Sequence, residues 1–153
     1  AFVRSGLDQG GVSFRLGDAA RGRAIYDQAG CGTCHRIGGD GPRLAPDLSD
    51  IGAIRRPGQI VTSLTNPGKA TMPINRMVTI VTRDGRTIHG RRFNEDTFGV
   101  QLIDTQEKIR SIDKADIARY DIGMTSGMPS FTGQLDDNGL ADLLAYLVSL
   151  KGQ

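Results

Sequence analysis

The chain has 153 residues, 38% of them hydrophobic and none of them Trp, and its 19 basic and 17 acidic residues give a formal charge of +2. This length suits one ordinary domain, or a small domain that carries an insertion. The near-balanced charge argues against a nucleic-acid-binding protein, which typically has a strong basic excess. No apolar run reaches the length of a membrane span.

The N-terminal part of the chain predicts an arm followed by a helix. Residues 1–17 are rich in glycine and have no sustained hydrophobic period, so we expect an extended arm or linker. The start at Ala1 fits a mature chain after signal-peptide cleavage, and equally a shortened chain. A short helix should then begin at Asp18, a suitable N-cap, and end at Gly30.

The next segment is dominated by turn-forming residues. Residues 36–58 are rich in Gly and Pro, and this composition predicts a loop. A short helix is expected over Gln59–Thr65, because Asn66-Pro67-Gly68 would stop it.

A change of pattern predicts a compact antiparallel sheet within residues 74–122. β-branched and alternating segments are separated by turn signals, of which Asp84-Gly85 is the strongest. The expected strands are 77–82, 86–90, 99–104, 108–112 and 117–122. The expected core residues of this sheet are Val78, Ile80, Val81, Ile88, Val100, Leu102 and Ile112.

The last segment has the clearest helical period. Its leucines recur at spacings of three and four, and Asp136 or Asp137 would cap the helix. These leucines are Leu140, Leu143, Leu144, Leu147 and Leu150. Because helices flank the strands in the sequence, we expect the sheet to be an insertion at about 74–122 in a helical domain of residues 18–153.

The string CGTCH at positions 31–35 contains both cysteines of the chain and one of its two histidines. One interpretation is a redox dithiol, which is usually found in a βαβ frame with a strand before the motif. A second is a zinc site, for which the available Cys and His ligands are Cys31, Cys34 and the two histidines. His35 is adjacent to Cys34, so binding both to one metal would strain the geometry.

The third interpretation is covalently bound haem, for which C-x-x-C-H is the signature. Cysteines three positions apart on a helical turn can both form thioethers with the porphyrin. The adjacent His35 can then bind the iron through its imidazole. The motif therefore predicts one haem c held by Cys31 and Cys34, with His35 as an axial ligand.

A sixth ligand would complete the iron coordination. Met128, in the loop Met124–Phe131, is the preferred candidate because Pro129 would stiffen the chain beside it. Met72 and Met124 remain alternatives, whereas Met77 opens a predicted strand and is expected in the core. His89 could instead supply a second imidazole, although its neighbours indicate an exposed strand position.

With these residues, the chain resembles the small His/Met-ligated c-type cytochromes. The stretch GDAARGRAIYDQAGCGTCH resembles the family's N-terminal helix and haem motif, GMPSF its methionine loop, and LADLLAYLVSL its C-terminal helix. This resemblance implies a mainly α cytochrome c fold, with the N- and C-terminal helices packed around haem. It also implies that Gly22, Tyr26 and Tyr146 lie where these two helices cross.

The chain is most similar to a bacterial subgroup with a β insertion, whose haem domain is often fused to large secreted dehydrogenase-like proteins. The segments APDLSDIGAIRR, TIVTRDGRTIHG and KADI carry this similarity. It implies that a backbone carbonyl accepts the Nδ1–H of His35, and of the two candidates, Pro42 and Pro46, Pro46 is favoured because Asp47-Leu48 follows it. It further implies that Arg55 or Arg56 pairs with a haem propionate, although a solvated surface arginine is an equal alternative.

The expected function is one-electron transfer by a periplasmic or otherwise exported carrier, and not enzymatic catalysis. The expected partners are a dehydrogenase that donates electrons and an oxidase or reductase that accepts them, with no nucleic acid and no membrane span. One alternative is a haem-based gas sensor or haem enzyme with a labile sixth ligand. A further alternative is a binding module in which the β insertion docks to a partner.

Overall fold

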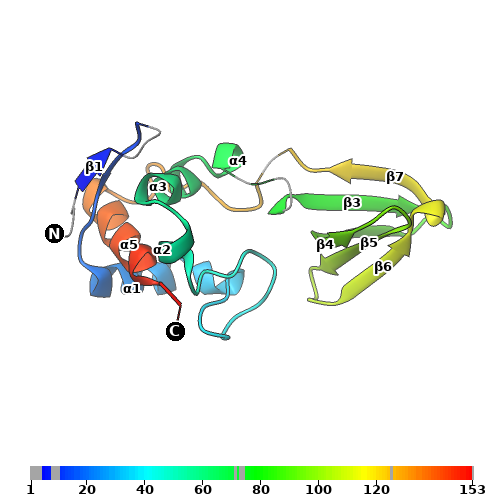
Figure 1. Ribbon diagram of the computed structural model, residues 1–153, viewed down its shortest axis with the longest axis horizontal. Helices are drawn as coiled ribbons and strands as arrows, with labels where there is room; N and C mark the ends of the chain where they lie inside the picture. The colour runs from blue at the N-terminus through cyan, green and yellow to red at the C-terminus, as the bar shows by residue number, and fades with distance from the viewer. Residues whose placement is uncertain (1–4, 8–10, 71, 73–74, 125, 153) are drawn as a thin grey trace.

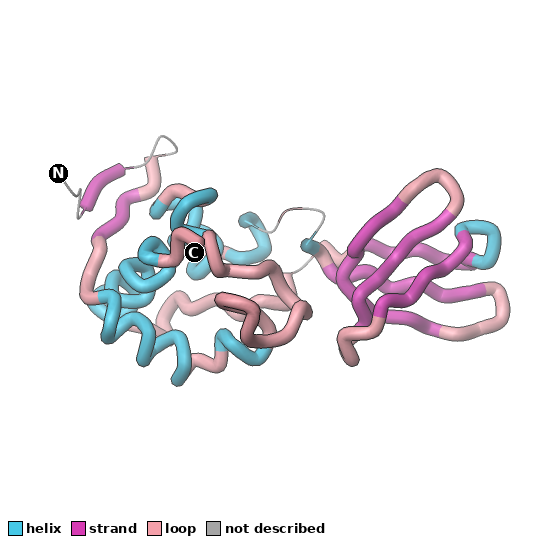
Figure 2. The backbone as a smooth tube through the Cα atoms, turned by 60° about the horizontal axis from the view of Figure 1, so that its bottom comes forward, coloured by secondary structure: helices cyan, strands magenta, loops and turns pink. Residues whose placement is uncertain are grey.

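The computed structural model describes residues 5–7, 11–70, 72, 75–124 and 126–152. Figures 1 and 2 show the helices gathered at one end of the molecule and the long strands β3–β7 at the other. The fold is therefore a helical unit with a separate antiparallel sheet. Across the described ranges, every helix is too short or too polar to cross a bilayer.

The main helices begin and end where the sequence indicated. The first helix is capped by Asp18, whose carboxylate accepts from the Arg21 amide, and Gly30 follows it with a φ of 69°. The last helix is capped by the carboxylate of Asp136, which accepts from the Gly139 amide. The helices are α1 (Ala19–Gln28), α2 (Ile51–Ile54), α3 (Pro57–Thr65), α4 (Pro67–Ala70) and α5 (Asp137–Ser149).

The segment predicted as loop over residues 36–58 holds more helix than expected. It contains α2, and α3 begins at Pro57 rather than at Gln59. Proline suits the first helical turn because it lacks the amide hydrogen that would have no partner there. The same rule explains α4, which begins at Pro67 directly after the Asn66 C-cap of α3.

Helices α1 and α5 cross in close contact, as the resemblance implied. The rings of Tyr26 and Tyr146 meet edge to face with centroids 5.6 Å apart. A Cβ at Gly22 would lie 1.9 Å from the Asp142 carbonyl oxygen, so only glycine fits between the two backbones. The buried Asp142 carboxylate also accepts from the guanidinium of Arg21 at 2.7 Å, which ties the two helices together.

The N-terminal arm folds back on itself within the described residues. Strand β1 (Ser5–Leu7) pairs in antiparallel fashion with β2 (Ser13–Arg15). The arm is also attached to α5, because the amide of Gly17 donates to the Ala141 carbonyl at 2.9 Å. It is thus a short hairpin docked on the helical unit, rather than only an extended linker.

The described residues form a five-stranded antiparallel sheet in the order β6-β5-β4-β3-β7. Strand β4 is longer than the predicted 86–90, and its pairing with β5 shifts register after Arg92, where it contains an irregularity. The strands are β3 (Met77–Thr82), β4 (Thr87–Glu95), β5 (Gly99–Asp104), β6 (Ile109–Asp113) and β7 (Ile117–Ile122). The short 3₁₀ turn η3 (Lys114–Asp116) links the last two.

Buried hydrophobic side chains of the described residues form two separate clusters. The helical cluster consists of Tyr26, Ile60, Leu64, Phe131, Leu143, Leu144, Tyr146 and Leu147. The sheet cluster consists of Val78, Ile80, Val100, Leu102 and Ile112. Of the predicted sheet core, Ile88 packs partly buried against its cluster and Val81 is also only partly buried.

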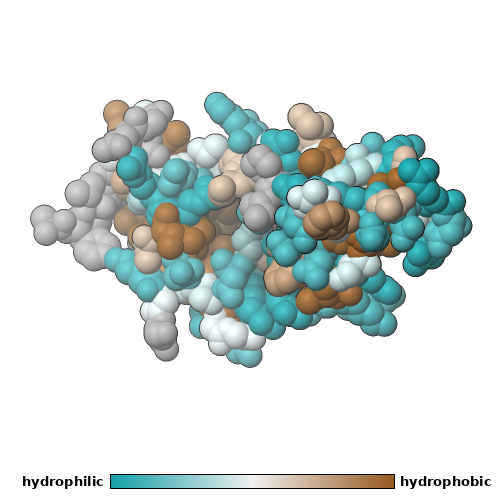
Figure 3. Space-filling model, turned by 45° about the vertical axis from the view of Figure 1, so that its right-hand side comes forward, coloured by the Kyte–Doolittle hydropathy of each residue, from teal (hydrophilic) through white to brown (hydrophobic). Residues whose placement is uncertain are grey.

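The surface in Figure 3 is mainly hydrophilic, with separate hydrophobic patches. On the sheet, exposed apolar side chains include Phe93, Phe98 and Ile109. Each half of the molecule therefore has a core of its own beneath a largely polar surface.

Candidate functional site

The CGTCH motif follows α1 directly and begins with the 3₁₀ turn η1 (Cys31–Thr33). The amides of Cys34 and His35 both donate to the Cys31 carbonyl, at 3.2 and 3.0 Å. This turn brings Cys31, Cys34 and His35 onto one short piece of backbone. Cys31 is half-buried and packs against the helical cluster, whereas Cys34 is exposed.

The imidazole of His35 is oriented by one strong backbone contact. Its Nδ1 lies 2.7 Å from the carbonyl oxygen of Pro46, which confirms the choice of Pro46 over Pro42 as hydrogen-bond partner. A carbonyl is only an acceptor, so Nδ1 carries the proton and the lone pair is left on Nε2. Burial lowers the pKa of His35, and a neutral imidazole is the form that binds a metal.

The loop after the motif is held close to His35 by its backbone. The Ala45 amide donates to the Cys34 carbonyl at 3.0 Å, and the Leu48 amide donates to the Arg36 carbonyl at 2.9 Å. The sequence did not indicate that position 41 requires glycine. Gly41 has a φ of 99°, and a Cβ added there would lie 2.6 Å from the His35 carbonyl oxygen. The Gly-rich composition of this loop was the available signal, but it did not single out this position.

The environment of the motif disfavours a redox dithiol. Burial raises the pKa of the Cys31 thiol, whereas a reactive cysteine requires a lowered pKa. Burial also raises the pKa of Tyr26 to about 12, and a Cβ at Gly32 of the turn would lie 3.7 Å from its ring. A helix leads into the motif and a loop leads out, which differs from the strand–helix frame of thioredoxin-type sites.

The methionine candidates differ clearly in burial. Met128 is partly buried and packs against the helical cluster, the same cluster that Cys31 contacts. Met124 is 77% exposed and Met72 is 50% exposed. Met77 opens β3 as expected, but it is only partly buried and is not part of the sheet cluster where it was expected. Met128 is thus the thioether that the structure places against the same core as the motif.

The segment after Met128 is fastened to the end of α3. Phe131 is buried, and its amide donates to the Leu64 carbonyl at 2.9 Å. The hydroxyls of Ser130 and Thr132 both donate to the Thr65 carbonyl, at 2.7 and 3.0 Å. These bonds use carbonyls that the end of a helix leaves without intrahelical partners, and they restrict the position of the methionine loop.

The remaining histidine lies on the sheet. His89 is exposed on β4, and its Nδ1 lies 2.9 Å from the Thr79 hydroxyl across the strand pair. The part of the chain that the structure describes holds no group of three or more His, Cys, Asp or Glu side chains suited to a metal ion. The zinc interpretation therefore receives no support from the structure.

The arginines expected near a propionate lie at the start of α3. Arg56 is its N-cap residue, and the preceding Arg55 is partly buried. Their role stays a prediction.

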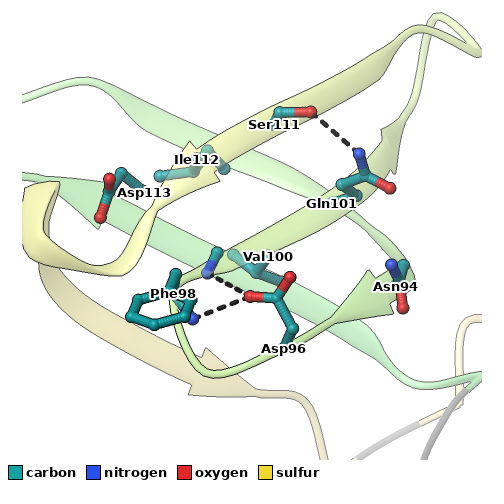
Figure 4. A pocket seen from close by; sticks show the side chains of 9 residues that line it. Asn94, Asp96, Phe98, Val100, Gln101, Ser111, Ile112 and Asp113 are labelled. Carbon is teal, nitrogen blue, oxygen red and sulfur yellow. Dashed lines mark hydrogen bonds between the residues drawn. The ribbon is translucent and has the colours of Figure 1, made fainter.

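A depression of about 340 Å³ lies on the sheet, away from the motif. Figure 4 shows Asp96 within it, accepting from the backbone amides of Phe98 and Gly99. Gln101 and Ser111 form a further hydrogen bond at 3.3 Å. Its lining contains no cysteine, histidine or methionine, so it offers no haem ligand.

The side chains at the motif suit covalently bound haem c in their chemistry. Two thiols lie one turn apart, an imidazole has its Nδ1 occupied by a carbonyl, and a thioether packs on the same cluster as Cys31. Thioether attachment and His/Met ligation need these groups. The donor set therefore fits haem better than it fits zinc or a dithiol.

Comparison with known proteins gives the same result. Residues 19–87 match the cytochrome c family. The matched stretch runs from α1 through the CGTCH motif to the start of β4, and it does not include Met128 or α5. The match covers less than half of the chain and supports a c-type cytochrome. No curated protein matched the chain.

Proposed function

We propose that this protein is a one-electron carrier with a single haem c, attached through Cys31 and Cys34 and ligated by His35 and Met128. In this proposal, residues 18–153 form the cytochrome domain, with the sheet as an insertion at about 74–122 and residues 1–17 as an N-terminal arm. The protein would act in the periplasm or another exported compartment. Its partners would be a dehydrogenase donor and an oxidase or reductase acceptor.

The observation that carries the proposal is the pairing of the CGTCH turn with the His35–Pro46 hydrogen bond. A C-x-x-C-H string can occur by chance, but the bond from Nδ1 also sets the tautomer and direction that an axial imidazole needs. The family match over residues 19–87, which includes this motif, supports the c-type cytochrome part of the proposal.

Each residue has a distinct task in this mechanism. Cys31 and Cys34 hold the group to the chain, His35 presents Nε2, and Met128 presents a soft sulfur that favours the reduced state. The bound haem supplies reversible one-electron exchange between its ferric and ferrous states. Cys31 and Met128 both pack against the helical cluster, so this side of the site is apolar.

The test is expression of the chain with a cytochrome c maturation system, followed by acid–organic extraction and intact mass. We expect haem to stay with the protein, and the mass to exceed that of the bare chain by one haem. A Cys31→Ala, Cys34→Ala double variant should lose covalent haem. Extraction of all haem from the unaltered protein would contradict the proposal.

Carbon monoxide separates the carrier from the alternative of a gas sensor or haem enzyme. A carrier with Met128 firmly bound should show a reduced spectrum that carbon monoxide leaves unchanged. A labile sixth ligand would let carbon monoxide bind rapidly and change the spectrum. That outcome would move the assignment to the alternative function.

A further inference from the structure

The loop that orients His35 extends from the helical unit toward the sheet, as Figures 1 and 2 show. We call residues 36–48 the post-motif loop. It supplies the Pro46 carbonyl that contacts His35 Nδ1 at 2.7 Å. Any contact that holds this loop therefore also acts on the imidazole.

Two side chains of the sheet contact the post-motif loop at one residue, Arg43. The Arg43 amide donates to Oε1 of Glu107 at 3.2 Å. The Arg43 carbonyl accepts from Nη2 of Arg91 at 3.1 Å. Side chains of the sheet thus contact both the backbone amide and the backbone carbonyl of Arg43, three residues before Pro46.

Glu107 occupies an unusual backbone position for its residue type. In the described part of the chain, it is the one non-glycine residue with positive φ, at 61°. It ends the turn between β5 and β6, where the Glu107 amide donates to the Asp104 carbonyl at 3.0 Å. Glycine is the favoured residue at such a position, because a Cβ makes the left-handed conformation costly.

The strained backbone at Glu107 carries the carboxylate that contacts the post-motif loop. Glycine would relieve the strain but has no side chain to accept from the Arg43 amide. Strained positions are maintained where surrounding contacts require them, and such positions concentrate at functional sites. The carboxylate at position 107 provides the acceptor that glycine lacks.

Arg91 provides the second half of this contact. It lies on β4 opposite Met77 of β3, and its side chain is partly buried. Among the described residues, its Nε is buried and has no hydrogen-bond partner. Its Nη2 is directed at the Arg43 carbonyl instead.

We propose that the sheet positions the post-motif loop through Glu107 and Arg91, and thereby controls the hydrogen bond between His35 and Pro46. Glu107 is the positioning residue of this contact. The inference rests on the proposed function, because its consequence is a change in haem potential. It makes the sheet part of the haem site rather than only a docking module.

The sign of the effect follows from the hydrogen bond. A strong bond from Nδ1–H to a carbonyl makes the imidazole a more basic ligand, which stabilises ferric iron. Releasing the loop weakens that bond, so the reduction potential should become more positive.

The test compares Glu107→Gln with Glu107→Gly. Both variants lose the same negative charge, but glutamine keeps an oxygen acceptor for the Arg43 amide and glycine does not. We expect Glu107→Gly to have a more positive reduction potential than Glu107→Gln. In the haem-free chains, the backbone amides of residues 43–45, 47 and 48 should exchange with solvent faster in Glu107→Gly.

Unfolding temperature separates positioning from plain stability. Glu107→Gly relieves the strained backbone, so its unfolding temperature should not fall below that of Glu107→Gln. A shift in potential without loss of stability is the result that a merely structural role would not produce. The inference is wrong if the two variants have equal reduction potentials when loaded with haem and equal amide exchange rates as haem-free chains. That outcome would leave the proposed function standing. Absence of covalent haem from the unaltered protein would instead overturn the proposed function, and the claim on potential with it.

Discussion

At the scale of single residues, burial separates the methionines that the sequence left as alternatives. Met128 packs against the helical cluster and its amide donates to the Ser126 hydroxyl at 3.1 Å. The sulfur of Met124 instead lies 3.9 Å from Nη1 of the Arg76 guanidinium. A sulfur that already contacts the core needs less reordering to act as a ligand.

Replacement of Met128 should therefore change the haem spectrum. We expect Met128→Ala to abolish the long-wavelength charge-transfer band of sulfur-ligated ferric haem and to lower the potential, because a thioether favours ferrous iron. Met124→Ala is the matched control and should keep the band. Loss of the band in Met72→Ala or Met124→Ala, with retention in Met128→Ala, would assign the ligand elsewhere.

A second residue-scale prediction concerns Glu95 in the sheet. Its carboxylate accepts from Lys114, Arg92 and Tyr120, at 2.9, 2.7 and 3.0 Å. The hydrogen bond from Lys114 is the largest cause that lowers the pKa of Glu95 from 4.5 to about 2. The side chain is 24% exposed, so solvent weakens this contribution only in part.

A group with a lowered folded pKa stabilises the protein above its unfolded pKa. This stabilisation is lost as the pH falls from 4.5 toward about 2. Glu95→Gln should lower the free energy of unfolding by about 1–2 kcal/mol at pH 7, and the difference should vanish near the low end of that range. Chemical denaturation across pH measures it. The control Asp121→Asn breaks an ion pair with Arg119 whose side chains are 67% and 55% exposed, so the free energy of unfolding should change little. An equal loss in both variants would show that the Glu95 contacts are not special.

At the scale of elements, the crossing of α1 and α5 depends on the absence of a side chain at Gly22. An added Cβ would lie 1.9 Å from the Asp142 carbonyl oxygen and 2.8 Å from Cβ of Tyr146. Both neighbours belong to a rigid helix, so the two helices would have to move apart. That movement would separate the helix that precedes the CGTCH motif from the one that follows the methionine loop.

Gly22→Ala should thus destabilise the helical unit although alanine is the better helix former. We expect a loss of about 3 kcal/mol, which exceeds the gain of ~1 kcal/mol from helix propensity. The control is Gly68→Ala in α4, whose added Cβ meets no atom within 4 Å. Thermal unfolding of both variants provides the measurement, and an unchanged melting temperature for Gly22→Ala would show that the crossing can relax.

At the scale of the whole molecule, the two hydrophobic clusters predict two unfolding units. The helical cluster contains Leu143 and the sheet cluster contains Ile80, both fully buried. The contacts at Arg43 that join the sheet to the post-motif loop are solvent-exposed hydrogen bonds. Such contacts add little to the cooperativity of unfolding.

Leu143→Ala and Ile80→Ala should therefore act on different transitions. Each should cost about 2–5 kcal/mol in its own unit. Calorimetry of the haem-free chain should show one transition shifted by the first variant and the other by the second. A single transition that both variants lower equally would mean that the two units fold as one.

The sequence alone determined the features that depend on local patterns. The sequence predicts a helix cap at Asp18, another at Asp136 or Asp137, a helix end at Gly30 and a cofactor motif at CGTCH, because each signal lies within a few neighbouring residues. Val78, Ile80, Val100, Leu102 and Ile112 followed from alternation along the strands. Short-range physics sets all of these, so they are visible in one dimension.

Tertiary structure decided what depends on distant parts of the chain meeting. Pro46 rather than Pro42 contacts His35, Met128 rather than Met124 reaches the helical cluster, and Glu107 contacts the backbone of Arg43. Only the Asp47-Leu48 that follows Pro46 favours it over Pro42 in the sequence, and a positive φ at a glutamate has no sequence signature. The physical reason is that packing and backbone hydrogen bonding choose among residues of equal local character, and that choice exists only once the chain has folded.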